Sequence, residues 1–210
     1  MSLPNDWLTR LRHSLAAAPN HDPAGWQLAG QPLSIFESVR AAMTTTPRAA
    51  AVLLPIVDRT GSPTLLMTTR AGHLRQHAGQ ISFPGGRIEA GDDDVLGAAL
   101  RETQEEIGIA PSQIQPLGFL PDQIVLTGFR ITPVVGLVRP DFELRVDSAE
   151  VAEVFEVPLE YLLAENFRPT RRVLRGLELT LHDLHFEGRV IWGATAGMLQ
   201  MLRAALLAEP

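Results

Sequence analysis

The sequence predicts an α/β protein in which a mixed β-sheet lies between helices. Three observations lead to this fold class. The run at 49–57 is almost continuously apolar, which is typical of a buried strand. A Pro-Gly-Gly loop at 84–86 precedes a helical pattern that ends near Gly108, and a second amphipathic pattern closes the chain at 194–207. Strands mixed with a few helices favour packed layers of sheet and helix.

Composition limits the class of protein. The chain has 210 residues, of which 45% are hydrophobic, enough for one sizeable core. It has no cysteine, so disulfides and thiol chemistry are excluded, and its net charge of -6 argues against a broad nucleic-acid surface. No apolar stretch approaches the roughly 20 residues of a membrane span, and the N-terminus lacks a secretory pattern. We therefore expect a soluble cytoplasmic protein with no nucleic-acid or membrane partner.

The first 45 residues are predicted to form an N-terminal helical extension and linker to a domain at 46–210. Apolar residues at helical spacing predict a helix at 6–17. The stretch 19–32 is rich in Pro, Gly and Asn and is interpreted as a linker. A second helix, capped by Ser34, is expected at 34–43. The sequence leaves open whether the extension covers a cleft or forms a homodimer contact.

The domain itself is predicted to begin with a strand pair. The buried strand at 49–57 and its partner at 64–69 are joined by a turn at 58–63, which is rich in turn-forming residues. After the central helix, Pro111 and Ser112 break the chain. The expected later elements are strands at 114–120, 129–138 and 153–157, a short helix at 159–164, a β-meander at 172–174, 177–186 and 190–192, and a final helix at 194–207.

The central helix carries an acidic face. Glu102, Glu105 and Glu106 are spaced i, i+3, i+4, so their carboxylates leave one side of a helix and repel one another. Arg101 can pair with Glu105 one turn on, but an excess of negative charge remains. A divalent cation is the natural compensation, and magnesium or manganese suits oxygen ligands best. Taken alone, such a charge run is more often a solvated helix face.

The residues before this helix are predicted to form a tight loop and to cap the N-terminus of the helix. Pro84-Gly85-Gly86 ends a strand and lets the main chain approach a ligand closely. One of three consecutive aspartates is expected to cap the helix, and the side opposite the glutamates is expected to be buried. The candidate caps are Asp92, Asp93 and Asp94, and the expected buried residues are Ala98, Ala99 and Ile107.

This segment resembles the Nudix box, which runs Gly, five residues, an acidic residue, seven residues, then Arg-Glu-apolar-x-Glu-Glu-x-Gly-apolar. The matching positions are Gly86, Asp92, Arg101, Glu102, Glu105, Glu106, Gly108 and Ile109. Asp92 stands where Glu is usual, eight residues rather than seven separate it from Arg101, and Thr103 replaces an apolar residue. The resemblance implies a Nudix-type α/β/α sandwich.

An upstream motif narrows the resemblance. Leu66-Met67-Thr68-Thr69-Arg70-Ala71 is followed by Arg75, Gly79 and Phe83-Pro84-Gly85-Gly86 at fixed gaps. This order is similar to the signature of the coenzyme A pyrophosphatase branch of Nudix hydrolases, with Ala71 in place of the usual Ser. The one-residue insertion in the box is also typical of that branch. Segments 127–136, 154–159 and 192–197 also look like its bacterial members, so the resemblance covers about residues 48–205.

The resemblance assigns roles around a metal. It implies that Glu102, Glu105 and Glu106 face the ion, with the Gly85 carbonyl as a further ligand, and that Arg101 orients a neighbouring carboxylate. Many Nudix enzymes use an acidic residue from a later loop as an extra ligand or general base. Glu150 is the first candidate here and Glu153 the second, and a solvated loop charge is almost as good an interpretation of either.

The substrate-binding residues implied by the upstream motif are Arg70, Arg75, Gly79 and Phe83. Guanidinium groups suit phosphate oxygens, so both arginines are candidates for the phosphates of coenzyme A, including its 3′-phosphate, with ordinary surface arginines as the alternative. His73 and His77 are interpreted as exposed loop histidines. The aromatic residues considered for adenine stacking are Trp192, Phe119 and Phe129, and core packing is favoured for each.

The expected activity is metal-dependent hydrolysis of the pyrophosphate bond of coenzyme A or its derivatives, giving 3′,5′-ADP and 4′-phosphopantetheine or its acylated form. The first alternative is a Nudix enzyme acting on another nucleoside diphosphate derivative, such as ADP-ribose or a dinucleotide. A second alternative is a nucleotide-sensing Nudix domain without activity, although such a sensor has no need to retain all three glutamates.

Overall fold

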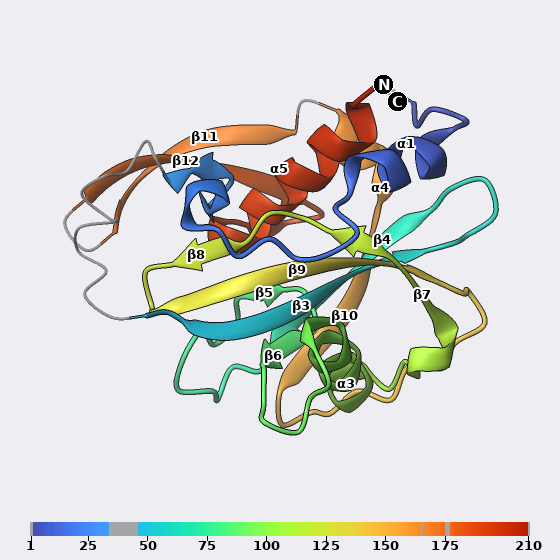
Figure 1. Ribbon diagram of the computed structural model, residues 1–210, viewed down its shortest axis with the longest axis horizontal. Coiled ribbons are helices and arrows are strands. Elements are labelled where there is room, and N and C mark those ends of the chain that lie inside the picture. Colours follow the sequence, from blue (N-terminus) through green and yellow to red (C-terminus); the bar gives the residue numbers. More distant parts are fainter. Residues whose placement is uncertain (1, 34–45, 165, 175–176, 210) are drawn as a thin grey trace.

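A computed structural model describes residues 2–33, 46–164, 166–174 and 177–209 (Figure 1). In these ranges the strands form one sheet of ten strands and a second of three. The large sheet is centred on β3 (Arg48–Val57), which pairs in parallel with β9 (Phe129–Val138) over its full length. The end of β3 pairs antiparallel with β4 (Thr64–Arg70), as the sequence predicts. The sheet is therefore mixed.

The other strands extend this centre. In the large sheet the order is β10-β4-β3-β9-β8-β1-β2, with β5 on β4, β6 on β3 and β7 on β9; in the small sheet it is β11-β12-β13. Their bounds are β1 (Gln27–Leu28), β2 (Gln31–Pro32), β5 (Ile81–Ser82), β6 (Gly85–Arg87), β7 (Ile114–Phe119), β8 (Gln123–Val125), β10 (Val151–Pro158), β11 (Phe167–Leu174), β12 (Leu177–Phe186) and β13 (Arg189–Ile191).

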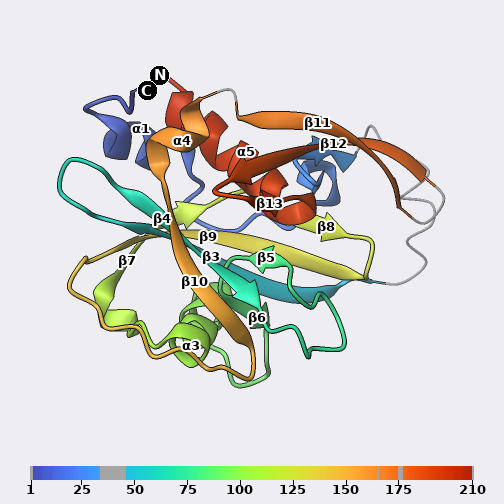
Figure 2. The ribbon, with the colours of Figure 1, turned by 180° about the vertical axis from the view of Figure 1, so that it is seen from behind.

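Helices cover both faces of the large sheet (Figures 1 and 2). One face carries α3 (Val95–Ile107), and the other carries α5 (Gly193–Leu207) together with the small sheet. The N-terminal helix α1 (Trp7–Ser14) packs on α5, and the short helix α4 (Leu159–Leu163) follows β10. This arrangement is the α/β/α sandwich that the sequence predicts.

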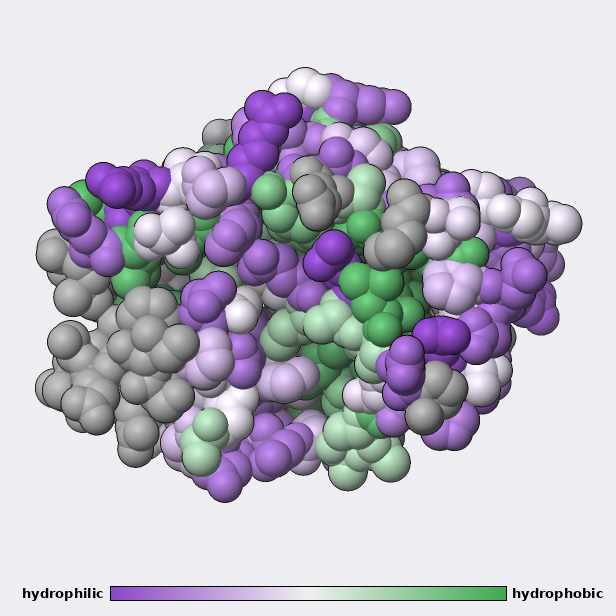
Figure 3. All heavy atoms as spheres, turned by 90° about the horizontal axis from the view of Figure 1, so that it is seen from above, coloured by the Kyte–Doolittle hydropathy of each residue, from purple (hydrophilic) through white to green (hydrophobic). Residues whose placement is uncertain are grey.

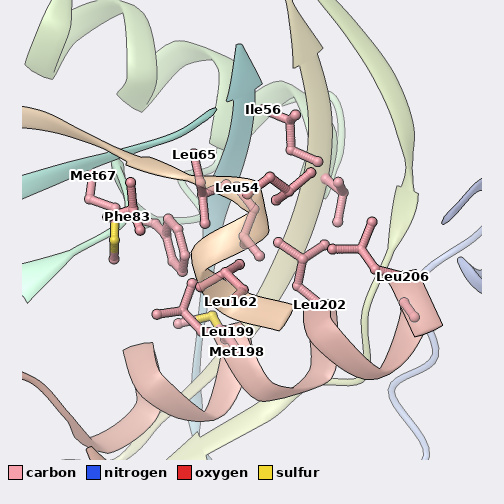
Figure 4. Packing of buried hydrophobic residues seen from close by; sticks show 14 of the residues in the cluster. Leu54, Ile56, Leu65, Met67, Phe83, Leu162, Met198, Leu199, Leu202 and Leu206 are labelled. Carbon is pink, nitrogen blue, oxygen red and sulfur yellow. The ribbon is translucent and has the colours of Figure 1, made fainter. Parts of the chain in front are cut away.

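Strand alternation on β3 separates two hydrophobic cores. Leu54 and Ile56 face α5, where they meet Leu199 and Leu202 (Figure 4). Residues of the other parity, such as Leu53, face α3 and pack with its buried residues. Ala98, Ala99 and Ile107 are fully buried, as expected from the sequence.

Viewed from the side of α1 and α5, the surface is largely hydrophilic, with hydrophobic residues in small groups among polar ones (Figure 3). Most of the apolar residues of α5 thus face inward, where they contribute to the core. Among the described helices, none combines the length and apolar character needed to cross a bilayer.

The prediction of a linker at 19–32 is wrong in part. Gln27 pairs with Gln123 of β8, and its N–H donates to the carbonyl of Asp122 at 2.8 Å. Ala29 (φ 48°) and Gly30 (φ 82°) turn the chain back into β2. Proline and glycine mark these turns correctly, but the two-residue strands between them are stabilised by a partner almost a hundred residues away.

The bounds of the other elements differ less from those expected from the sequence. The strand β8 was not expected, and β11 begins at Phe167 rather than at 172. The expected helix at 34–43 lies outside the described residues. Asp94, and not Asp92 or Asp93, caps α3, because its carboxylate accepts a hydrogen bond from the Gly97 N–H at 2.7 Å.

Candidate active site

The helix α3 carries three glutamates at the predicted spacing, and two of them, Glu102 and Glu106, contact the glycine loop. We call Glu102, Glu105 and Glu106 the α3 glutamates. The helix ends at Gly108, whose φ of 81° lies in the left-handed region. A Cβ at this position would stand 2.6 Å from the Cβ of Arg145, so glycine both ends the helix and admits the following loop.

Arg101 donates two hydrogen bonds to the carboxylate of Asp92. Its Nε lies 2.8 Å from Oδ1 and its Nη2 3.1 Å from Oδ2 of that carboxylate. The hydrogen bonds from Arg101 lower the pKa of Asp92, and the same contacts raise the pKa of the guanidinium. The Nη1 of Arg101 also lies 3.0 Å from both Glu102 and Glu105. The inserted residue in the box therefore leaves the Asp92–Arg101 pair intact.

Glu106 is the most buried of the α3 glutamates, with 3% of its surface exposed. Its Oε2 accepts a hydrogen bond from the Gly85 N–H at 3.3 Å, and its Oε1 lies 3.7 Å from Nη1 of Arg70. Burial raises the pKa of Glu106 to about 8; Arg70 and Gly85 oppose this shift, and Glu150 and Glu102 add to it. A further positive charge at this position would favour the ionised carboxylate.

Glu102 and Glu105 differ in burial. The carboxylate of Glu102 packs against Gly86, where a Cβ would stand 2.4 Å from its carboxyl carbon. Burial raises the pKa of Glu102, and its hydrogen bond from Arg101 opposes that shift. Glu105 is 61% exposed at the side chain and reaches solvent beside Arg101.

The backbone at Gly85 accepts only glycine without strain. Its φ is 152°, and a Cβ would stand 2.4 Å from the carbonyl oxygen of Ala51 and 2.6 Å from Cα of Val52 on β3. The loop is thereby pressed between β3 and α3, next to Glu106. This is the position from which the Gly85 carbonyl was predicted to serve as a ligand.

The loop after β9 brings Glu150 to the same cluster. Its course is fixed by the Asp147 N–H, which donates to the Glu106 carbonyl at 2.9 Å, and by the Ala71 N–H, which donates to the Glu150 carbonyl at 2.8 Å. Glu150 raises the pKa of both Glu102 and Glu106 by repulsion. Glu153, the second candidate, instead lies 2.5 Å from Nη2 of Arg189. Of the two candidates, only Glu150 has a charge that acts on Glu102 and Glu106, while Glu153 is engaged by Arg189.

The upstream motif lines a cavity beside the carboxylates. Arg70 and Phe83 contribute to a cavity of about 490 Å³, in which Phe83 is 2% exposed. Gly79 takes a φ of 69° in the exposed loop, and its N–H donates to the Arg70 carbonyl at 3.1 Å. Arg75 and His73 are exposed in the same loop. Gly79 therefore supports Arg70 through the backbone, and Arg75 projects towards solvent.

The cavity is lined mainly by apolar residues from distant parts of the chain. The contributions of β1 and β12 are not expected from the sequence, because no local motif marks them. Of the aromatic candidates, Phe129 and Trp192 line the cavity and are partly buried, whereas Phe119 packs beside the α3 core. The apolar lining is Leu28, Ala29, Val52, Ile81, Phe83, Ile124, Val125, Leu126, Phe129, Ile131, Val173, Leu179, Leu181, Trp192, Ala194 and Met198.

The chemistry of the donors fits a divalent cation. Hard oxygen atoms are available from the three carboxylates of α3, from the nearby acidic loop and from the backbone of the glycine loop. Among the described residues, however, no three His, Asp or Glu side chains are already arranged as a set of metal ligands. The reason is visible in the contacts, since Arg101 engages Glu102 and Glu105 while Glu106 turns to Gly85 and Arg70. Binding an ion there requires these side chains to rotate.

Comparisons with known proteins agree with the box resemblance. A family model described as NUDIX domain matches residues 46–176. A protein of Shigella flexneri serotype 5b named "Uncharacterized Nudix hydrolase NudL" is 41% identical over 182 residues, covering 85% of this chain and 94% of that protein. The protein of the same name from Salmonella typhimurium has the same identity and coverage.

A solved structure supports the fold. The crystal structure of a Nudix hydrolase from M. smegmatis, RenU, aligns with a TM-score of 0.52 at 19% identity, covering 78% of this chain and 89% of that chain. At this identity the likeness extends to the arrangement of sheet and helices alone.

Proposed function

This chain belongs to the Nudix family of hydrolases, enzymes that cleave pyrophosphate bonds, and on that premise we propose that its substrate is coenzyme A or one of its thioesters. Hydrolysis of the diphosphate would release 3′,5′-ADP and 4′-phosphopantetheine or its acylated form. The proposal depends on the upstream motif, because the box alone is common to Nudix enzymes with many substrates.

One observation carries the proposal: Arg70 joins the two motifs in a single site. It is the arginine of the upstream motif, it lies 3.7 Å from Glu106 of the box, and it lines the apolar cavity. A diphosphate at the α3 glutamates would therefore have a guanidinium beside it and an apolar chamber next to it. The volume of about 490 Å³ is within the usual range for small-molecule sites, and coenzyme A needs both kinds of surface.

Nudix hydrolases generally use divalent metal ions. We assign the ion, Mg²⁺ or Mn²⁺, to the α3 glutamates and the Gly85 carbonyl, where it would neutralise the diphosphate charge and activate a water. The chain supplies the rest of the chemistry. Arg70 donates hydrogen bonds to phosphate oxygens, and Glu150 or one of the α3 glutamates accepts the proton of the attacking water. Arg101, fixed by Asp92, holds Glu102 and Glu105 in position.

The experiment is product analysis on a substrate panel of coenzyme A, dephospho-coenzyme A, ADP-ribose and NADH, with Mg²⁺ or Mn²⁺. We expect coenzyme A to be cleaved fastest, and Glu106→Gln to lose at least about a hundredfold in kcat because a site carboxylate is removed. Glu209→Gln, which changes an exposed glutamate at the C-terminus, is the matched control.

Two results would contradict this assignment. If coenzyme A is the slowest substrate of the panel, the enzyme is a Nudix hydrolase of another nucleoside diphosphate derivative. If ligands bind without turnover at any metal concentration, the domain is a sensor. Activity that survives Glu106→Gln would remove that residue from its assigned role.

A further inference from the structure

Two arginines that occupy none of the fixed positions of either motif lie over one aromatic ring. The guanidinium carbon of Arg48 is 4.0 Å from the ring centroid of Phe129, and that of Arg87 is 5.5 Å from it. Neither forms an ion pair with a carboxylate of the described residues. Two like charges gathered around one ring repel each other, so a bound anion would stabilise this arrangement.

The register of the sheet explains why these groups meet. Arg48 is opposite Phe129 where β3 pairs with β9, and Arg87 is opposite Ala50 where β6 pairs with β3. Residues two apart on a strand share a face, so Arg48, Ala50 and Val52 line one side of the sheet. Val52 and Phe129 also line the apolar cavity. The arginine pair is therefore fixed by three strands at the rim of that cavity.

The same strand connects the arginine pair to the carboxylates. The Arg87 carbonyl accepts a hydrogen bond from Nη2 of Arg101 at 3.2 Å, and the preceding Gly86 packs against Glu102. The side chain of Arg87 points to the cavity face, while the glycine before it faces α3. Arg87 thus connects the two places along β6, because its carbonyl contacts Arg101 beside the α3 glutamates and its guanidinium lies at the arginine pair.

We propose that Arg48 and Arg87 form a second phosphate subsite, which recognises a phosphomonoester on the nucleotide half of the substrate. Such a group carries about -1.5 to -2 charges at pH 7, which two guanidinium groups neutralise. A guanidinium lying over a ring keeps its N–H edge free for phosphate oxygens. The subsite rests on the proposed function and makes it specific, since it separates coenzyme A from nucleotides without that phosphate.

This subsite revises the roles expected for the other arginines. Arg70 is near Glu106 and so serves the diphosphate, and Arg75 is exposed in its loop. Arg70 and Arg75 are candidates from the sequence for the 3′-phosphate, and the subsite assigns that group to Arg48 and Arg87 instead.

The first test compares coenzyme A with dephospho-coenzyme A in steady-state kinetics. We expect Arg48→Ala and Arg87→Ala each to lower kcat/KM for coenzyme A about tenfold, the size of a lost hydrogen bond to a charged group, and to leave dephospho-coenzyme A within about twofold. Arg87→Lys keeps part of the preference. The control is Arg12→Ala, an exposed arginine on α1 that leaves both substrates unchanged.

The second test measures binding without turnover. Metal-free protein is titrated calorimetrically with 3′,5′-ADP and with AMP. We expect the wild type to bind 3′,5′-ADP at least tenfold more tightly and the double variant Arg48→Ala/Arg87→Ala to bind both alike. Because both arginines are exposed, the variants are expected to fold, and a thermal melt checks this.

The outcomes separate the two proposals. Wild-type protein that binds the two nucleotides equally, or variants that lose activity equally on both substrates, would overturn the subsite. Faster cleavage of ADP-ribose than of coenzyme A would overturn the proposed function instead, and the calorimetric comparison would still decide the subsite on its own.

Discussion

At the scale of single residues, charge in this site is organised by Asp92. Its two oxygens fix both Nε and Nη2 of Arg101, so Nη1 points to Glu102 and Glu105, while Nη2 also donates to the Arg87 carbonyl. Glu102 and Glu105 repel each other along the helix, and the guanidinium of Arg101 holds them together. Asp92, which lies outside the helix, in turn holds Arg101.

Replacing Asp92 by Asn removes the negative charge that faces Arg101 while keeping the size and shape of the side chain. We expect Asp92→Asn to lower activity about 10- to 100-fold, as is usual when a residue that orients ligands is changed, and to weaken Mn²⁺ binding in parallel. Steady-state kinetics and a Mn²⁺ titration measure the two effects. Asp92→Glu restores the acid usual at this position of the box and serves as the conservative control. Equal metal affinity in all three proteins would show that Arg101 needs no support.

Thr103 shows why a departure from a motif can be harmless. It replaces an apolar residue, yet it is fully buried, because its hydroxyl donates to the Ala99 carbonyl at 2.7 Å within the same helix. The sequence shows the substitution, and only the helix geometry shows that the polar group has a partner.

At the scale of elements, the sequence predicts those strands and helices that have a long apolar pattern. The strands at β3 and β4 and the helices α3 and α5 follow from long apolar patterns, and their observed bounds lie close to the expected ones. Strands of two or three residues, such as β1 and β8, carry no such pattern. Their hydrogen bonds come from partners distant in sequence, so local propensity cannot reveal them.

One ion pair fastens β10 to the β3–β4 turn. Nε of Arg59 lies 2.8 Å from Oε2 of Glu156, and Thr64 donates to the same oxygen. The hydrogen bonds from Arg59 lower the pKa of Glu156. A carboxyl whose pKa is depressed in the folded state stabilises the protein above its ordinary pKa, and this contribution is lost as the pH falls through the folded value.

We therefore expect Glu156→Gln to lower the free energy of unfolding by about 1 kcal/mol at pH 7, and by much less at an acidic pH below the depressed pKa of the wild-type carboxyl. Urea unfolding at the two pH values measures the difference. Glu178→Gln, at an exposed strand position, is the control. A deficit of the same size at both pH values would show that packing, and not charge, is responsible.

At the scale of the whole molecule, the cavity depends on contacts that join the ends of the chain. Leu28 and Ala29 come from the N-terminal segment, Leu181 from β12 and Met198 from α5, and all four line the same space. The box and the upstream motif predict the carboxylate side of the site, because those residues are close in sequence. The apolar side has no motif, since its residues share only the requirement of being apolar.

One close contact joins α5 to the turn after β1. Gly197 is buried, and a Cβ at this position would stand 2.4 Å from both the Ala29 carbonyl carbon and the Gly30 nitrogen. Both of these are backbone atoms of a turn that cannot rotate away. A larger residue must therefore push the N-terminal segment, and with it one wall of the cavity, away from the helix.

We expect Gly197→Ala to cost about 1–3 kcal/mol of stability, as is usual for overpacking, and to raise KM for the substrate several-fold with little change in kcat. The helix α3 and its glutamates lie on the other face of the sheet from α5, so we expect the substitution to leave them in place. Thermal unfolding and steady-state kinetics measure both effects. Gly25→Ala, where the nearest atom is 3.9 Å away, is the matched control. A fall in kcat at unchanged KM would mean that the N-terminal segment acts on the carboxylates and not on the cavity.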